Sequence, residues 1–131
     1  MWLISGGAYQ GKLDYIHNLE DLIHIRKDQI AEGSTCNFDE LLKCSVVNHF
    51  HLWIDRMLRQ EQEVYALIDI IIEKNPSIVI IIDELGCGIV PVDSYDRRFR
   101  EITGRISCKL AKEAKEVHRV ICGIGVVIKH D

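Results

Sequence analysis

The chain has 131 residues, of which 47% are hydrophobic and 27% charged, and its formal net charge is −4. This size and composition are typical of one globular domain covering residues 1–131, and the acidic balance argues against a protein that binds nucleic acid through its phosphates. The longest apolar run, residues 78–83, is far shorter than the roughly 20 residues of a membrane span, so we expect no such span. The five cysteines show no C-x-x-C spacing, which favours a reducing compartment, and we therefore expect a cytoplasmic protein.

The first half of the chain predicts a strand, a helix and a loop. Residues 2–5, WLIS, form a short apolar strand that leads into a glycine-rich turn. Residues 11–27 repeat apolar side chains at helical spacing and predict a helix. Residues 30–44 predict a loop with a short helix, for which Asn37 or Thr35 is a suitable N-cap.

The second half continues the alternation of strands and helices. Residues 52–75 predict one long helix, which ends at the Asn75-Pro76 pair, and residues 94–116 predict another with Ser94 as its cap. Three further runs predict strands: residues 45–50, 77–83 and 117–129. Strands that alternate with helices predict an α/β fold with a mostly parallel sheet flanked by helices.

The turn after the first strand has the frame of a phosphate-binding loop: Gly6, four residues, Gly11 and Lys12. In such a loop backbone N–H groups and the start of the following helix converge on an anion, and the lysine adds a positive charge. The alternative is a simple glycine-rich turn with an exposed lysine. Leu13 stands where a Ser or Thr hydroxyl would hold magnesium. The candidate nucleotide-binding residues are Gly6, Gly7, Ala8, Tyr9, Gln10, Gly11, Lys12 and Leu13.

Acidic and imidazole side chains follow two other predicted strands. Asp83 and Glu84 end the apolar strand 77–83, at the edge of the sheet where the glycine loop is expected. We expect both carboxylates to face the site, the alternative being solvated acids at a strand end. His49 and His51, placed on one face of a strand, have a spacing that can ligate zinc or cobalt, but no third ligand is evident, which favours a core or edge position.

The run from Glu84 to Arg105 resembles the adenosylcobinamide kinase/adenosylcobinamide-phosphate guanylyltransferase family of cobalamin synthesis. It is similar to the family pattern E-V-G-x-G-I-V-P followed by R-x-F-R-[DE]-x-x-G-R, and the glycine loop and the run VVNHFHLWIDRML are similar as well. The resemblance implies a P-loop NTPase-like fold, GTP or ATP as the nucleotide, adenosylcobinamide as a corrinoid partner, and a homo-oligomer, commonly a trimer. Family members phosphorylate a corrinoid hydroxyl and then transfer GMP through a guanylylated histidine.

We expect Lys12 and Glu84 to be the catalytic residues of such a site. Arg97 and Arg100 lie on one face of the predicted helix 94–116, where they can engage an anionic ligand or a neighbouring subunit. Together with Asp83, these two arginines are the candidate substrate or interface residues.

The chain departs from the family pattern at positions that take part in the family's reactions. Leu13 and Asn48 replace the two side chains that anchor magnesium, so a magnesium cofactor is in doubt. The stretch between residues 12 and 48 is shorter than in the family and has no Arg-Pro, so neither His17 nor His24 takes the role of the guanylylated histidine. We expect nucleotide binding without guanylyl transfer and with weak or absent kinase activity. The alternatives are an active corrinoid kinase with a rebuilt metal site, or a non-enzymatic nucleotide- or corrinoid-binding module.

Overall fold

The computed structural model of the chain describes residues 1–19, 24–85 and 93–130. Its centre is a six-stranded sheet in the order β2-β3-β4-β1-β5-β6. Every pairing is parallel except that of β6 with β5, which is antiparallel. The strands are β1 Trp2–Gly6, β2 Ile30–Glu32, β3 Val46–Asn48, β4 Val79–Asp83, β5 Glu116–Ile121 and β6 Ile124–Lys129.

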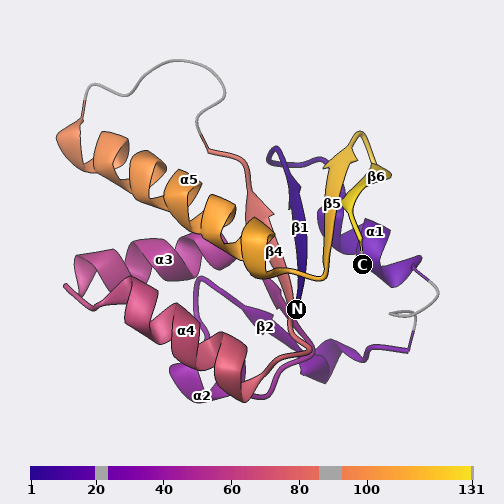
Figure 1. The fold of residues 1–131 in the computed structure, drawn as a ribbon, viewed down its shortest axis with the longest axis horizontal. Coiled ribbons are helices and arrows are strands. Elements are labelled where there is room, and N and C mark those ends of the chain that lie inside the picture. Colours follow the sequence, from indigo (N-terminus) through magenta and orange to yellow (C-terminus); the bar gives the residue numbers. More distant parts are fainter. Residues whose placement is uncertain (20–23, 86–92, 131) are drawn as a thin grey trace.

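Helices lie on both sides of this sheet (Figure 1). The larger helices α3, α4 and α5 lie on one side, and α1 lies on the other. The part of the chain that the structure describes has no helix with the length and apolar character needed to cross a bilayer. The helical elements are α1 Lys12–His17, the 3-10 turn η2 Lys27–Gln29, α2 Phe38–Leu41, α3 Phe50–Arg59, α4 Val64–Lys74 and α5 Ser94–Glu113.

Alternate residues of the central strand β4 belong to two different hydrophobic clusters. Ile80 and Ile82 belong to the larger cluster, together with Phe50 and Trp53 of α3. Ile81 belongs to the smaller cluster on the opposite face, where Ile16 of α1 packs. Because successive side chains of a strand point to opposite faces, a strand covered on both sides is apolar throughout. The predicted α/β fold with a mostly parallel, helix-flanked sheet is confirmed.

The first predicted helix is much shorter than expected. The helix predicted over residues 11–27 ends at His17, residues 24–26 are not helical, and part of the predicted span lies outside the described residues. The side chain of Asn18 donates to the carbonyl oxygen of Asp14 at 2.9 Å. This bond competes with the helical pattern at the C-cap, where the backbone N–H of Asn18 bonds the carbonyl oxygen of Tyr15 at 3.1 Å instead of that of Asp14.

The long helix predicted over residues 52–75 is two helices, α3 and α4. Glu61, between them, has a left-handed backbone with φ 56°. Residues 59–63 carry only polar, exposed side chains, so this stretch has nothing to bury against the core and the chain turns there. Helix α3 also begins earlier than predicted, at Phe50, because the strand predicted over residues 45–50 ends at Asn48.

Three smaller predictions are corrected or refined by the structure. Residues 30–32 form the strand β2 rather than a loop, while α2 has Asn37 as its N-cap, as predicted. Asp93, not Ser94, caps α5 and accepts a hydrogen bond from the backbone N–H of Tyr95 at 2.7 Å. The run 117–129 is a hairpin, whose two turn residues have the positive φ values typical of a tight type I′ turn.

Candidate functional site

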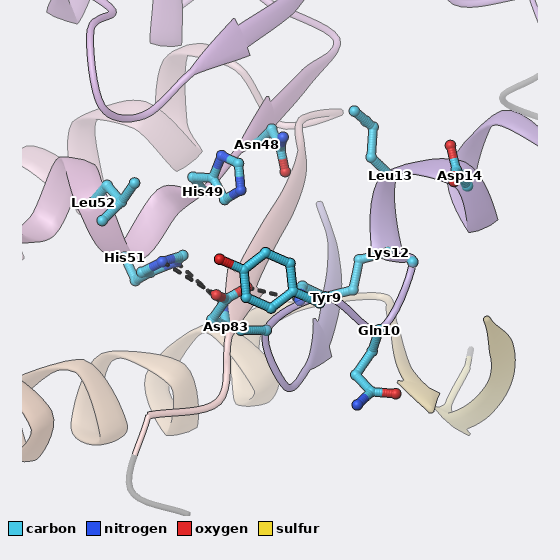
Figure 2. Close-up of a pocket in the computed structure, with 12 residues that line it drawn as sticks. Tyr9, Gln10, Lys12, Leu13, Asp14, Asn48, His49, His51, Leu52 and Asp83 are labelled. Atoms are coloured by element: carbon cyan, nitrogen blue, oxygen red, sulfur yellow. Dashed lines mark hydrogen bonds and ion pairs between the residues drawn. The ribbon is translucent and has the colours of Figure 1, made fainter. Parts of the chain in front are cut away.

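A pocket of about 370 Å³ lies at the carboxyl ends of the central strands (Figure 2). Gly6 at the end of β1 is paired in register with Asp83 at the end of β4, so the glycine loop and this carboxylate meet at one edge of the sheet. Ligands of parallel α/β sheets bind at such an edge. The lining residues are Ala8, Tyr9, Gln10, Gly11, Lys12, Leu13, Asp14, Asn48, His49, His51, Leu52 and Asp83.

The glycine loop needs glycine at both ends of its turn. A Cβ atom at Gly6 would lie 2.4 Å from the backbone carbonyl oxygen of Val120 on β5, so a larger residue does not fit there. Gly11 has φ 83°, in the left-handed region that glycine adopts without strain. Gln10 attaches the loop to the β5–β6 turn, because its Oε1 accepts a hydrogen bond of 2.6 Å from the N–H of Cys122. The loop is therefore held in place by the C-terminal hairpin.

Lys12 is a buried lysine with two oxygen partners. Only 7% of it is exposed, and its Nζ lies 2.7 Å from Oδ1 of Asp83. The same Nζ donates to the carbonyl oxygen of Gly7 at 2.7 Å. Lys12 is therefore not the exposed lysine of a simple glycine-rich turn, and its ammonium group is positioned at the base of the loop.

His51 is the second partner of Asp83. Its Nε2 lies 3.4 Å from Oδ2 of Asp83, and its Nδ1 accepts a hydrogen bond of 3.3 Å from the backbone N–H of that residue. Because Nδ1 accepts, the ring proton is on Nε2 and the imidazole is neutral. Burial lowers the pKa of His51, although the charge of Asp83 opposes this.

His49 is oriented by a carboxylate from a neighbouring strand. Its Nδ1 lies 2.6 Å from Oε1 of Glu32 on β2, and its side chain is 44% exposed on the pocket wall. Burial raises the pKa of Glu32, but hydrogen bonds from Ser34 and His49 outweigh it, and the pKa is lowered overall. The ionised Glu32 carboxylate thus supports a ring that faces the pocket.

Other candidate residues are not among those that line this pocket. Glu84 is paired with Arg119 at 2.8 Å and is not among the lining residues. Arg97 is exposed and Arg100 is partly buried on α5, and neither lines the pocket. The stretch from 86 to 92 of the family-like run lies outside the described residues.

Four of the six histidines were considered as candidates from the sequence, and they fall into two groups. His17 and His24 are exposed. His49 and His51 are not on a strand, since β3 ends before them, but their rings are 5.8 Å apart at the start of α3. Sequence reasoning did not assign His49 to the phosphate site. Its position near the carboxyl end of a predicted strand, like that of Asp83, is the signal that could have done so.

The residues around the pocket do not fit a magnesium ion. Magnesium prefers oxygen ligands, mainly carboxylates. Leu13 offers none and Asn48 is neutral, while the Asp83 carboxylate is already engaged by Lys12 and His51. Asp14 also lines the pocket, but it is then the one carboxylate left there among the described lining residues. Within residues 1–19, 24–85 and 93–130, no group of three or more His, Cys, Asp or Glu side chains could hold a metal.

Comparison with known proteins gives one family. A family model described as cobinamide kinase/cobinamide phosphate guanyltransferase matches residues 31–128, a segment that begins after the glycine loop. The bifunctional adenosylcobalamin biosynthesis proteins CobU of Salmonella typhimurium and of Escherichia coli are each 48% identical over 52 residues, which is 40% of this chain and 29% of theirs. The corresponding protein CobP of Pseudomonas aeruginosa is 25% identical over 95% of this chain and 78% of its own length. The chain thus aligns with less than a third of the two enteric relatives.

Proposed function

The chain belongs to the cobinamide kinase/cobinamide phosphate guanyltransferase family, and from this membership and the geometry of the pocket we propose that it binds the polyphosphate of GTP or ATP in cobalamin biosynthesis. The pocket residues of the glycine loop and Lys12 hold the phosphates, and a corrinoid such as adenosylcobinamide is the second ligand. The relatives named above are described as bifunctional adenosylcobalamin biosynthesis proteins, which supports this assignment.

The position of Lys12 is the observation that carries the proposal. A lysine is rarely buried unless it is paired, and here the pair is formed at the carboxyl edge of a parallel sheet, next to a turn that requires glycine. When a phosphate enters, the ammonium group can exchange the carbonyl of Gly7 for a phosphate oxygen by a small movement. Asp83 keeps the Nε2–H of His51 as a partner.

We propose further that guanylyl transfer is lost and that kinase activity is weak or absent. The segment between residues 12 and 48 is short and has no Arg-Pro. Leu13 and Asn48, which line the pocket, supply no charged oxygen for the metal that offsets developing charge in phosphoryl transfer. Binding falls less than catalysis, because the backbone donors of the loop and Lys12 remain.

One experiment with α-labelled GTP tests binding and the loss of covalent transfer together. We expect the protein to retain the label on a filter under native conditions. We expect no label on the protein after denaturation with detergent at alkaline pH, where a phosphoramidate survives. A covalent label would overturn the loss of guanylyl transfer, and no retention under native conditions would overturn nucleotide binding.

We also propose that the chain is a homo-oligomer, a trimer by family resemblance. The edge strand β6 exposes a row of apolar side chains, namely Ile124, Val126, Val127 and Ile128. An unpaired apolar edge strand favours association with another chain. Light scattering of the purified protein measures the number of chains in the assembly.

A further inference from the structure

The pocket has little positive charge for a site that holds a polyphosphate. Lys12 is the only lysine or arginine among the described lining residues, and Asp83 already neutralises it at 2.7 Å. Asp14 lines the same pocket and adds a negative charge. A bound triphosphate therefore needs a further source of positive charge. Histidine is the one other side-chain type on the described pocket wall that can become positively charged.

The two pocket histidines differ in their ability to accept a proton. In His51, Nδ1 already accepts the N–H of Asp83, and burial lowers the pKa of the ring. In His49, Nδ1 lies 2.6 Å from Oε1 of Glu32, a carboxylate that can accept a hydrogen bond from an Nδ1–H group. The Nε2 of His49 has no hydrogen-bond partner among the described residues, and the ring lies across the pocket from Lys12 (Figure 2).

The backbone conformation of His49 sets the direction in which its side chain leaves the chain. His49 has a left-handed conformation, with φ 54° and ψ 49°, which is uncommon for a residue with a Cβ atom. A Cβ atom at Gly33 would lie 2.1 Å from the carbonyl oxygen of His49, so the turn after β2 packs directly against this backbone. Such conformations persist where the surrounding structure fixes them, and they are frequent at ligand sites.

We propose that His49 is a phosphate-binding residue that takes up a proton when a nucleotide polyphosphate enters the pocket, so that an imidazolium supplies charge in the absence of a magnesium site. Glu32 accepts a hydrogen bond from Nδ1–H, and Nε2–H donates to a phosphate oxygen. This inference rests on the proposed function. It adds that the same site binds a polyphosphate together with a proton.

The charged groups that face His49 favour this exchange. Three carboxylates, those of Glu32 on β2, Asp83 on β4 and Asp14 on α1, and the phosphate favour a positive ring. Lys12 on α1 opposes it. His51 on α3 remains neutral. The proposal predicts that binding at pH 7.5 takes up about one proton. Affinity should then rise as the pH falls, by at most about tenfold per pH unit.

Calorimetry without divalent metal tests this proposal. Sodium triphosphate and GTP are each titrated at pH 7.5 in two buffers with different ionisation enthalpies, which gives the number of protons exchanged. We expect the wild type to take up about one proton more than His49→Gln, and His49→Gln to bind about tenfold more weakly. The exposed His24→Gln is the control and should behave as wild type. Equal proton uptake by wild type and His49→Gln overturns the proposal, as does an uptake that is lost in His51→Gln instead.

Two further measurements keep the test independent of how one variant folds. Glu32→Gln retains a hydrogen-bond acceptor for Nδ1 but loses the negative charge, so its proton uptake should fall. The ring ¹⁵N shifts of His49 in the wild type should move from neutral to charged values on adding triphosphate, and unchanged shifts with bound ligand contradict the proposal. If neither ligand binds at all, the proposed function itself fails; binding without proton uptake removes only the role of His49.

Discussion

Replacing Lys12 by alanine is expected to weaken the binding of GTP and ATP by about 10- to 100-fold. Hydrogen bonds to charged groups contribute about 1.5–3 kcal/mol, and 1.4 kcal/mol corresponds to a factor of ten in affinity. The variant also leaves the carboxylate of Asp83 without its partner at 2.7 Å, next to the incoming phosphate. Equilibrium titration of wild type and variant measures the change.

Two matched variants separate this effect from general charge loss. Lys27→Ala removes an exposed lysine that does not line the pocket and should leave affinity unchanged. Asp83→Asn should strengthen phosphate binding, because it removes a negative charge and frees Lys12. If Lys12→Ala bound nucleotide as tightly as wild type, the nucleotide would be held elsewhere on the molecule.

Restoring the two metal-anchoring side chains should revive phosphoryl transfer. For the double variant Leu13→Ser and Asn48→Asp, we expect magnesium-dependent phosphorylation of adenosylcobinamide to rise by at least about a hundredfold, equal to ~2.7 kcal/mol of barrier. Both positions line the same pocket, so their new oxygens face one space. Hydrolysis of GTP, measured in parallel, reports on the site when the corrinoid does not bind.

The two single variants are the controls for this prediction. Each single variant supplies only one of the two oxygens. Because the effects of two groups that bind one ion are not additive, each single variant should show far less phosphorylation activity than the double variant. If the double variant gained magnesium affinity but no turnover, the weak kinase activity would have a cause other than the lost anchors.

Much of the fold follows from local sequence patterns. The run of residues 77–83 is apolar on both faces and of strand length, which predicts a buried parallel strand with Asp83 at the edge of the sheet. The glycine spacing placed the loop at the same edge, because β1 and β4 end together. The contact between Lys12 of the loop and Asp83 of β4 therefore follows from the parallel arrangement of the strands.

The parts that were missed depend on contacts between distant segments. β2 has only three residues and gives no periodic signal, so its pairing with β3 decides the structure of residues 30–32. The contact of Glu32 with His49 follows from that pairing and was invisible without it. The pairing of Glu84 with Arg119 is likewise a contact between distant segments, since Arg119 is supplied by β5.

The dependence of nucleotide affinity on magnesium tests most directly the claim that this pocket holds a polyphosphate without a divalent ion. GTP is titrated into the full chain by calorimetry, once with a chelator present and once with millimolar magnesium. We predict that the two dissociation constants agree within about threefold, because the loop, Lys12 and His49 supply the contacts. Binding that requires magnesium, or no binding in either condition, would contradict the claim.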